Sequence, residues 1–315
     1  MNIIRNLDEI KGPFVRPVLT IGNFDGVHRG HHVLFNKVLE RAGALGGQGI
    51  VMTFDPHPIK VMKPGNGPPL ITPTEQKLEL ISREPVDYII CLPFTREFAA
   101  ISAEAFVRDI LVRKIGVREV VVGYDYSFGA GREGDISLLR YLGDKLGFLV
   151  HVIEPVYIDG MLVSSTSIRK FIREGNLEDA RRLLGRHYQI CGRVVPGQGR
   201  GAALLGFPTA NLVPVDELVP KEGVYAVSVD LGGAVFQGVT NIGCNPTFGD
   251  APLTIETHLM DFSGDILGRN IRITFLRRLR DEMAFDGVNA LSSQIARDIQ
   301  EARELFSTLE GGAAA

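Results

Sequence analysis

The chain has 315 residues, of which 45% are hydrophobic and 23% are charged. This composition is sufficient to bury a full core, and the length predicts a soluble globular protein of about two domains. The formal net charge of −3 at pH 7 offers no general attraction to polyanions. We therefore expect neither a nucleic-acid partner nor a membrane partner.

The cysteines and the apolar segments indicate a reducing compartment. Cys91, Cys191 and Cys244 lie far apart and lack the paired spacing of a zinc site or a disulfide framework. We therefore expect buried thiols. No segment approaches the roughly 20 consecutive apolar residues of a membrane span, and the first residues mix apolar and charged side chains. These features predict a cytoplasmic location.

The first half of the chain alternates short, β-rich apolar runs with helical patterns. Strands are expected over residues 18–21, 50–54, 86–92, 119–122 and 148–153. Thr72 is expected to cap a helix whose first position is a proline, and Ser102 to cap a helix over 103–115. Two more helices are expected over 165–173 and 177–184. This alternation predicts an α/β domain with a parallel, doubly wound sheet.

The pattern changes near Gly185 to short β-runs separated by glycine and proline. Strands are expected over residues 189–195, 224–231, 235–240, 253–260 and 271–275, which predicts an antiparallel barrel. A final helix over 288–309 has apolar residues at helical spacing and should pack on the barrel. The expected domains are residues 1–186 and 187–310, followed by a flexible tail over 311–315.

The most informative segment is Gly22-Asn-Phe-Asp-Gly-Val-His-Arg-Gly-His31, between the first expected strand and the first helix. Ligands of open α/β sheets bind at the carboxyl ends of the strands, where glycines admit phosphate and a helix N-terminus attracts anions. His28 and His31 can donate hydrogen bonds to phosphate oxygens there. A metal site that adds His32 and His57 is an alternative, but neither cysteines nor a helical H-E-x-x-H pattern supports it.

Other polar segments follow expected strands and should reach the same edge of the sheet. They are Phe54-Asp-Pro-His-Pro58, Gly123-Tyr-Asp-Tyr-Ser-Phe-Gly129 and the hydroxyl-rich run Ser164-Ser-Thr-Ser-Ile-Arg169. Each alone would be an ordinary loop or helix cap. Their convergence on one edge predicts a binding site.

The second half has its own candidate site. A glycine-rich stretch, Gly192-Arg-Val-Val-Pro-Gly-Gln-Gly-Arg-Gly201, precedes Gly206-Phe-Pro-Thr-Ala-Asn211, in which Thr209 and Asn211 can face one cation. Along the expected strand at 253–260, Glu256 shares one face with His258. Taken by itself, such a face is most simply interpreted as the solvated outer face of the strand.

These segments resemble the FAD synthetase module of bacterial bifunctional riboflavin kinase/FAD synthetases, which are similar to the H-x-G-H nucleotidyltransferases. The Phe-Pro-Thr-Ala-Asn string resembles the signature of riboflavin kinases, and the likeness spans nearly the whole chain. It implies a Rossmann-like nucleotidyltransferase domain followed by an antiparallel Greek-key β-barrel with a C-terminal helix. It further implies phosphorylation of riboflavin to FMN and adenylylation of FMN to FAD, both with ATP and Mg2+.

In the first domain the resemblance implies that His28, His31 and Arg169 are catalytic, with the histidines on the α-phosphate of ATP. The implied nucleotide-binding residues are Gly22, Asn23, Phe24, Asp25, Asp125, Ser165 and Thr166. The implied flavin-binding residues are Asp55, Pro56, His57, Pro58 and Phe128.

In the second domain it implies that Glu256 is the general base and that Thr209 and Asn211 hold the metal ion. Gly197, Gly199, Phe207 and Pro208 are the implied nucleotide-binding residues, and Arg280 and Glu282 belong to a loop that closes on flavin. The partners would be small molecules only, and the protein a monomer or weak homo-oligomer.

Three alternatives stay open. Departures from the family pattern, such as Tyr126-Ser127 and Asp55, would permit an enzyme with only one live activity. A flavin- or nucleotide-binding regulatory protein could keep the same residues without turnover. An RNA-linked, aminoacyl-adenylate-forming enzyme also uses H-x-G-H elements, but the chain has no Lys-Met-Ser-Lys-Ser-type loop and no basic footprint.

Overall fold

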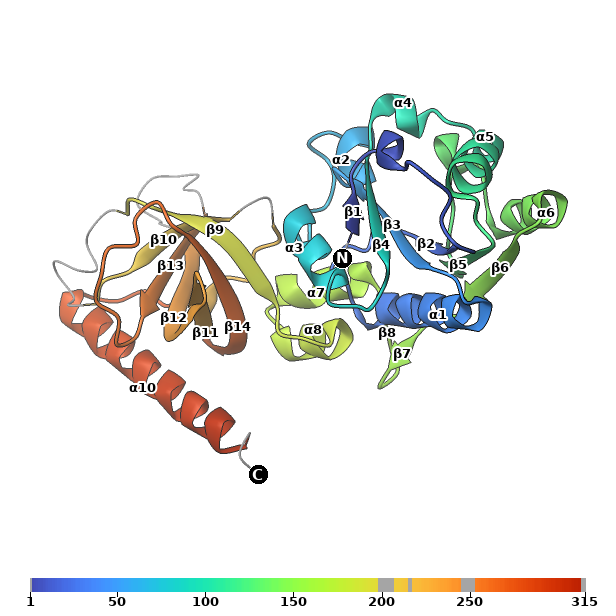
Figure 1. Cartoon of the computed structure of the whole chain (residues 1–315). Helices are drawn as coiled ribbons and strands as arrows, with labels where there is room; N and C mark the ends of the chain where they lie inside the picture. The colour runs from blue at the N-terminus through green and yellow to red at the C-terminus, as the bar shows by residue number, and fades with distance from the viewer. Residues whose placement is uncertain (1, 198–206, 215–216, 245–252, 313–315) are drawn as a thin grey trace. The chain divides into compact units, whose positions relative to one another are not determined.

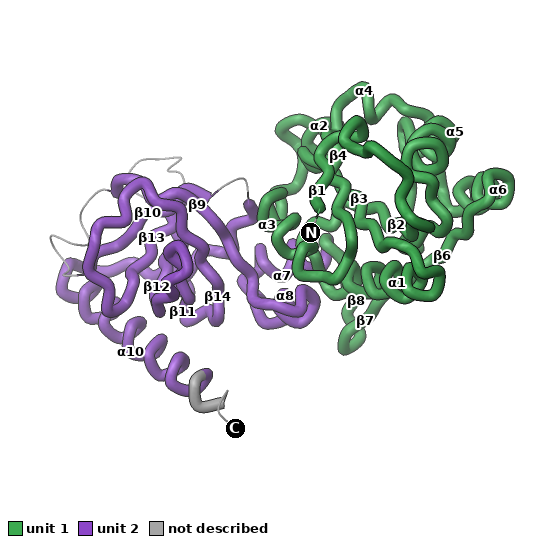
Figure 2. Tube along the Cα trace, viewed as in Figure 1, with its two compact units in different colours: residues 1–165 green, residues 166–315 purple. Residues whose placement is uncertain are grey.

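A computed structural model describes residues 2–197, 207–214, 217–244 and 253–312. Its contacts divide the chain into two compact units, Met1–Ser165 and Thr166–Ala315, drawn in green and purple in Figure 2. The sequence predicted a boundary after residue 186, which would leave two helices with the first domain. The contact-based units place those helices, apart from Ser165, with the barrel, and the predicted boundary and tail stay predictions.

The first unit is built around the sheet strands. Its elements are β1 (Asn2–Ile4), η1 (Leu7–Glu9), β2 (Val18–Ile21), α1 (Arg29–Leu45), β3 (Gly49–Asp55), α2 (Pro58–Met62), α3 (Thr74–Ile81), β4 (Tyr88–Pro93), α4 (Arg96–Ala99), α5 (Ala103–Ala105), η2 (Phe106–Ile115), β5 (Glu119–Gly123), η3 (Ala130–Arg132), α6 (Ile136–Leu146), β6 (Leu149–Ile153), β7 (Tyr157–Ile158) and β8 (Met161–Leu162).

The sheet has six parallel strands in the order β1-β4-β3-β2-β5-β6 (Figure 1). The order from β4 to β6 is that of a Rossmann-like sheet, with β1 added at the edge beyond β4. The chain reverses its direction of winding between β2 and β5. The predicted parallel, doubly wound sheet is therefore confirmed, and the reversal marks where such sheets bind ligands.

Both faces of this sheet are covered, which explains why its strands are apolar throughout. Ile50 and Met52 of β3 pack into one cluster with residues of η2 and α6. Val51, between them, faces the other way and packs with Phe35 of α1 and Leu78 of α3. Side chains thus alternate along each strand, and they pack into a separate core on each face of the sheet.

The predicted strands of the first half are all present, but two details differ. β1 was not predicted, because it has only three residues and Asn2 and Ile3 are exposed. The helix expected to be capped by Thr72 begins at Thr74 instead, with Pro73 before it and no side-chain cap. The Thr74 hydroxyl donates to the Asp55 carboxylate over 2.5 Å, so the first residue of α3 contacts the end of β3.

The helix expected over 103–115 is confirmed as continuous helical chain. The hydroxyl of Ser102 accepts a hydrogen bond from the amide of Ala105, as expected of an N-cap. From Phe106 to Ile115, however, the segment is π-helical, which the sequence pattern did not indicate.

The second unit is a closed barrel with flanking helices. Its elements are α7 (Ser165–Glu174), α8 (Leu177–Leu184), β9 (Gln189–Val195), β10 (Ala210–Pro214), β11 (Gly223–Leu231), β12 (Ala234–Cys244), β13 (Leu253–Leu259), β14 (Asn270–Arg280) and α10 (Val288–Gly312), with α7 starting one residue inside the first unit.

The barrel strands follow the cyclic order β10-β13-β12-β11-β14-β9. All neighbouring pairs are antiparallel, and β14 returns to lie beside β11 after the β11-β12-β13 meander. This arrangement is a Greek key, so the predicted barrel topology is confirmed. β10 was not predicted as a strand, because Pro208 and Pro214 at its ends are typical of a loop.

The C-terminal helix packs on the barrel as predicted, mainly through its second half. Ala302 and Phe306 are buried against Val224, Val239 and neighbouring barrel residues. Helix α8 contacts the barrel too, at β14. No helix in the described part of the chain is long and apolar enough to cross a membrane.

The prediction of buried thiols is confirmed in part. Cys91 on β4 is buried and Cys191 on β9 is half-buried, and both are free thiols. The side chain of Cys244 lies outside the described residues. Burial raises the pKa of the Cys91 thiol, so this group is protonated at neutral pH.

A buried ion pair fastens α1 to the sheet and gives a stability prediction. Arg41 donates two hydrogen bonds, of 2.7 and 2.8 Å, to Glu119 of β5, whose side chain is 3% exposed. These bonds hold the pKa of the Glu119 carboxyl below its usual range. Glu119 also bonds to Nε2 of His151 over 2.6 Å, so Arg41→Met removes one of its two charge-compensating partners, and we expect it to lower the free energy of unfolding of the first unit by more than the loss of an exposed pair would.

Differential scanning calorimetry measures this effect, and Lys37→Met is the matched control. Lys37 lies on the same helix and pairs with Glu40, whose side chain is 60% exposed, so the loss of this pair should lower the stability less. Equal losses in the two variants would contradict the assigned role of the buried pair.

Candidate functional sites

The loop between β2 and α1 lies at the point where the winding of the first sheet reverses. Phe24 and Val27 have positive φ values of 49° and 38°, which are unusual for residues with a β-carbon. Both side chains are buried, and the Phe24 ring packs edge-on against Phe35 and His31. Packing thus holds the loop in a strained conformation that a free peptide would avoid.

His28 and His31 stand together at the start of α1. Their rings stack with centroids 3.5 Å apart, and His28 is the N-cap residue of the helix. The amide of His28 donates to Nδ1 of His31 over 3.2 Å, so in the neutral ring Nε2 of His31 carries the proton and can donate. The helix N-terminus beside these rings favours an anion.

Gly30 makes room for the histidine pair. A β-carbon at this position would lie 3.2 Å from the Cε1 and Nδ1 atoms of His28. The glycine between the two histidines therefore lets the His28 ring fold back over the first turn of the helix.

The side chain of Asp25, in the loop between β2 and α1, is buried and does not point to solvent. Its carboxylate is 3% exposed and accepts hydrogen bonds from the amides of Ile71 and Thr72, each at 3.0 Å for the nearer oxygen. Ser165 donates its hydroxyl to the carbonyl of Asp25 over 2.9 Å. Asp25 was predicted to bind nucleotide, and its carboxylate is engaged within the protein.

Lys77 of α3 is a site residue that sequence analysis missed. Its side chain is 4% exposed, and its ammonium donates to the carbonyls of Asn23 and Phe54 over 3.2 and 2.9 Å. Asn23 follows β2 and Phe54 lies near the end of β3, so one amine joins the loop after β2 to the end of β3. The only sequence signal is a lysine directly before the apolar Leu78 in a helix.

The loop after β3 carries the predicted flavin-binding residues. Asp55, His57 and Pro58 are half-buried and Pro56 is exposed. His57 caps α2 by accepting a hydrogen bond from the amide of Ile59 over 3.1 Å. Because β2 and β3 are parallel neighbours, this loop and the histidine loop emerge at the same edge of the sheet.

The loop after β5 reaches that edge too. Asp125, predicted to contact nucleotide, is exposed. Phe128, predicted to contact flavin, is only 7% exposed and stacks on Tyr126 with centroids 5.5 Å apart. Its ring is therefore mainly part of the core beneath the loop. The loops after β2, β3 and β5 are brought together at one edge, as the sequence predicted.

The remaining residues predicted for this site lie on α7. Ser165 begins the helix, Thr166 is exposed and Arg169 is half-buried. Thr166 and Arg169 belong to the second compact unit. Their predicted contacts with phosphate stay predictions.

The second candidate site is a row of polar side chains across three barrel strands. Glu256 of β13 lies opposite Asn211 of β10 and opposite Asn241 of β12. Paired residues in antiparallel strands project on the same face, and here the neighbours Ile255 and Thr257 fill the interior. Asn211, Glu256 and Asn241 therefore form one row on the outer face of the barrel.

Gly197 approaches this row closely. A β-carbon at this position would lie 2.0 Å from Nδ2 of Asn211, so the backbone there passes against the amide. Thr209 is half-buried directly before β10, two residues from Asn211 and thus on the same face of the extended chain. Gly199 was also predicted to bind nucleotide, and it lies outside the described residues.

The chain before β10 is held by His258. The Nδ1 atom of His258 donates to the carbonyl of Pro208 over 2.9 Å, and its ring meets that of Phe207 edge-on. Phe207 is half-buried and Pro208 is exposed. The outer face of β13 thus fixes the approach to the predicted metal-binding residues.

Of the two residues predicted for the flavin loop, Arg280 is the last residue of β14 and Glu282 follows the strand. Glu282 is exposed and accepts a hydrogen bond from Nδ2 of Asn241 over 3.2 Å, which joins it to the polar row. Arg280 donates to both oxygens of the buried Asp298 on α10, with a shortest distance of 2.8 Å. Gln294 donates to the same carboxylate. Arg280 therefore anchors the loop to α10.

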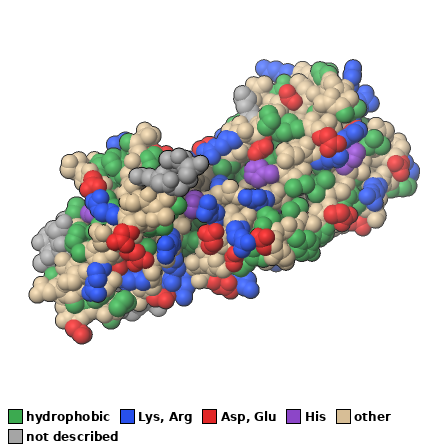
Figure 3. Space-filling model, turned by 90° about the horizontal axis from the view of Figure 1, so that it is seen from below, with side chains coloured by type: hydrophobic (Ala, Val, Ile, Leu, Met, Phe, Trp, Pro, Cys, Tyr) green, Lys and Arg blue, Asp and Glu red, His purple; other side chains and the backbone are tan. Residues whose placement is uncertain are grey.

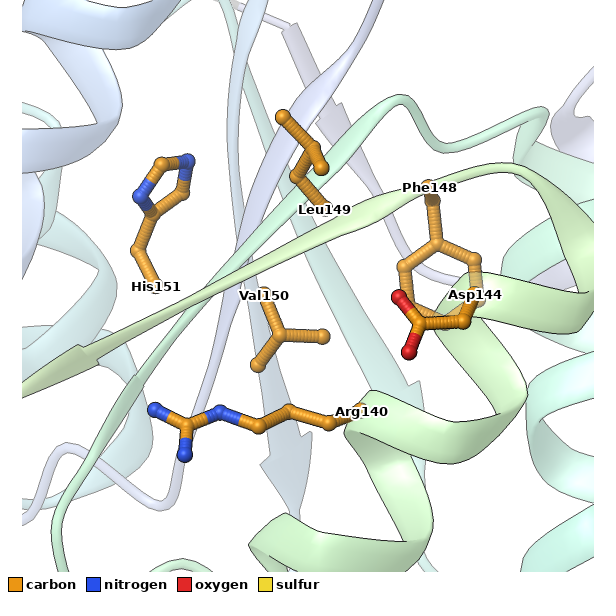
Figure 4. A pocket seen from close by; sticks show the side chains of 6 residues that line it. All are labelled: Arg140, Asp144, Phe148, Leu149, Val150 and His151. Carbon is orange, nitrogen blue, oxygen red and sulfur yellow. The ribbon is translucent and has the colours of Figure 1, made fainter.

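Neither site coincides with the cavity between α6 and β6. That cavity has a volume of about 260 Å3 and is lined by Arg140, Asp144, Phe148, Leu149, Val150 and His151, none of which was predicted as a site residue (Figure 4). Among the described residues, no three His, Cys, Asp or Glu side chains gather as metal ligands. On the face drawn in Figure 3, basic and acidic side chains are interspersed.

Comparison with protein families gives each half of the chain a match. Residues 14–167 match the family described as FAD synthetase, and residues 184–306 match the family described as riboflavin kinase. The class of the protein is thus defined: a Rossmann-like nucleotidyltransferase domain followed by a kinase domain of the β-barrel type.

Individual relatives agree over the whole chain. The bifunctional riboflavin kinase/FMN adenylyltransferase of Escherichia coli strain K12 is 39% identical over 308 residues, covering 97% of this chain and 98% of the relative. Its counterpart from Pseudomonas fluorescens is 40% identical over 306 residues, with coverages of 97% and 98%. The chain belongs to the bifunctional riboflavin kinase/FMN adenylyltransferase family.

A solved structure shares the entire architecture. It comes from Streptococcus pneumoniae, is described as a macrolide-efflux protein, and matches with a TM-score of 0.84 and 31% identity. The match covers 96% of this chain and 98% of that chain. The order of sheet domain, barrel and C-terminal helix is therefore found in an experimental structure as well.

The buried carboxylate of Asp25 gives a prediction that does not depend on ligands. Asp25→Ala leaves the amides of Ile71 and Thr72 without their acceptor in a buried environment, so we expect the first unit to lose about 2–4 kcal/mol of stability. Asp25→Asn keeps one acceptor oxygen and should lose less. Calorimetry of both variants tests this, and equal stability of Asp25→Ala and the unchanged chain would refute it.

Proposed function

We propose that the first unit transfers the adenylyl group of ATP to FMN and that the second unit phosphorylates riboflavin to FMN. The family match over the full chain supports both activities. The observation that carries the first assignment is the stacked His28–His31 pair at a helix N-terminus, where the winding of the sheet reverses. For the second, it is the row formed by Asn211, Glu256 and Asn241.

In adenylyl transfer, a phosphate oxygen of FMN attacks the α-phosphorus of ATP, the bond to the bridging oxygen of the β-phosphate breaks, and pyrophosphate leaves. His28 and His31 would donate to the oxygens that gain charge at the α-phosphate. The proton on Nε2 of His31 and the N-terminus of α1 suit that role. The pair is held in place by packing before substrate binds, so little reorganisation is needed during the reaction.

The other predicted residues would bind and orient the substrates. Asn23 and Asp125 have exposed side chains on loops at the same edge and would position ATP. Gly22, with Phe24 packed beneath it, would admit phosphate. Ser165, Thr166 and Arg169 would hold the departing pyrophosphate, because hydroxyls and a guanidinium bind phosphate oxygens.

The loop at residues 55–58 would hold the flavin of FMN. Its bonds to Thr74 and to the amide of Ile59 limit its movement. Phe128, buried beneath the loop after β5, would shape the floor of that site rather than supply a broad contact surface.

In the kinase reaction, the oxygen of a riboflavin hydroxyl attacks the γ-phosphorus of ATP, and ADP leaves. Glu256 would accept the proton of that hydroxyl. A hydroxyl is a poor nucleophile, so a positioned proton acceptor is needed. Phe207, Pro208, Gly197 and Gly199 would bind the nucleotide. Glu282, joined to Asn241, and Arg280, anchored on Asp298, would contact the flavin.

Thr209 and Asn211 would hold Mg2+, because hydroxyl and amide oxygens are ligands that this ion accepts and because Asn211 is confined by the close backbone of Gly197. When bound, the ion would neutralise charge on the phosphates of ATP. Glu256, beside Asn211, would keep its own task as proton acceptor.

The proposed partners are small molecules only: ATP, riboflavin, FMN and FAD. The net charge of −3 supports this choice, because it offers no general attraction to nucleic acid or to an anionic membrane. We place the enzyme in the cytoplasm, where the free thiols of Cys91 and Cys191 would stay reduced, as a monomer or weak homo-oligomer.

Separate variants should uncouple the two activities. Glu256→Gln removes the proton acceptor, so we expect riboflavin phosphorylation to fall about 100-fold or more while FAD formation from supplied FMN is kept. The double variant His28→Asn with His31→Asn should lose FAD formation from FMN and keep riboflavin phosphorylation. Chromatography of flavin products, started separately from riboflavin and from FMN with ATP and magnesium, measures both steps.

The same assay separates the alternatives. Loss of both steps in either folded variant would count against two independent sites. One absent step in the unchanged chain would indicate a single live activity, and binding without turnover would favour a regulatory protein.

Gly197 provides a second test of the kinase site. In Gly197→Ala the new methyl group would displace the Asn211 amide, so we expect phosphorylation to fall about 10- to 100-fold while FAD formation is unchanged. Gly43→Ala is the control, because no atom lies within 4 Å of the added carbon and alanine favours helix α1. An unchanged kinase rate in Gly197→Ala would remove Asn211 from the site.

A further inference from the structure

Lys77 is a buried lysine beside the first site, and its two acceptors belong to different segments of the chain. Its ammonium donates to the carbonyl of Asn23, which follows β2, and to that of Phe54, near the end of β3. The Asn23 carbonyl also accepts from the hydroxyl of Thr53 over 3.2 Å. The amine therefore links the backbone of the nucleotide loop (residues 22–27) to the end of β3, directly before the flavin loop (residues 55–58), and adds to the link that Thr53 makes.

The segment around Lys77 contacts both loops a second time. Thr74, one helical turn earlier, donates its hydroxyl to the carboxylate of Asp55 over 2.5 Å. In the turn before α3, the amides of Ile71 and Thr72 donate hydrogen bonds to the carboxylate of Asp25. Helix α3 with its preceding turn is thus a common support for both loops.

Stability alone does not account for a lysine at this position. Its side chain is 4% exposed, and burial lowers the pKa of its ammonium, while Cys91, Asp25 and Asp55 oppose that shift. A buried charge costs free energy unless its partners compensate, and an apolar side chain beside Leu78 would avoid that cost. What an apolar side chain would not supply is the link between the two carbonyls.

We propose that Lys77 is a positioning residue for adenylyl transfer, which couples the nucleotide loop to the flavin loop so that occupancy of one improves binding at the other. The proposal rests on the assignment of these loops to ATP and FMN. In this role Lys77 does not need to touch either substrate. It acts through the Asn23 and Phe54 carbonyls, and its loss would let the reacting phosphates drift out of alignment.

The test is the initial rate of FAD formation over a grid of ATP and FMN concentrations. FAD formation reports only the first site, so binding of the same molecules to the kinase site does not interfere. In the unchanged chain we expect the KM for FMN to fall about 5-fold or more between low and saturating ATP. In Lys77→Met we expect the ratio of the KM for FMN at low ATP to that at saturating ATP to approach 1. We also expect kcat to fall about 10- to 100-fold.

Leu78→Ala is the matched control for a merely structural effect. Leu78 is the next residue of α3 and is 2% exposed, so its truncation weakens the same unit without touching either carbonyl. The ratio of KM values should persist in Leu78→Ala, and riboflavin phosphorylation should be unchanged in both variants. Lys77→Arg, which keeps charged donors, should restore part of the ratio.

Each further outcome has one meaning. A chain that makes no FAD from FMN at all would overturn the proposed function and the role of Lys77 with it. Normal FAD formation with no dependence of the FMN KM on ATP, or with the same dependence in Lys77→Met, would overturn the coupling role alone. Should Lys77→Met fail to fold, Lys77→Gln, which keeps a shorter neutral donor, is measured in its place with the same criteria.

Discussion

Parallel strands deliver the loops that follow them to a single edge of their sheet, and the first unit depends on this constraint. The histidine loop after β2, the Asp55 loop after β3 and the Asp125 loop after β5 are distant in sequence yet emerge together. The reversal of winding between β2 and β5 separates their flanking helices and leaves space there. Chemistry that needs several donors around one phosphate can therefore be assembled from short, separate motifs.

In the barrel, the register of strand pairing determines which side chains of the second site lie next to one another. Antiparallel pairing places Asn211, Glu256 and Asn241 side by side on the outer face while Thr240 and Thr257 bond to each other inside. A slip of one residue would exchange these sets and bury the carboxylate. The same hydrogen bonds that close the barrel therefore also orient its proposed catalytic row.

Local patterns in the sequence were sufficient for most of the architecture. Apolar runs and turn residues predicted the sheet, the barrel and the last helix, and the motifs predicted which loops would meet. The exceptions depend on distant partners. The helix α3 begins at Thr74, which bonds to Asp55, and not at Pro73 after a cap at Thr72. Lys77 looks like an ordinary surface lysine in the sequence, but it bonds to carbonyls that follow β2 and end β3. Similarly, burial raises the pKa of Glu217 to about 8. The residues next to Glu217 in the sequence do not indicate that this carboxyl is buried.

The closure of the barrel has a consequence for how copies of this chain could aggregate. A closed ring of strands leaves no unpaired backbone edge, whereas the open sheet ends in β1 and β6. β1 offers only three residues, but β6 offers five and includes Leu149, which is 57% exposed. Within the described strands of these two sheets, β6 is therefore where edge-to-edge pairing between misfolded or concentrated molecules would begin, and a charged residue there would discourage it.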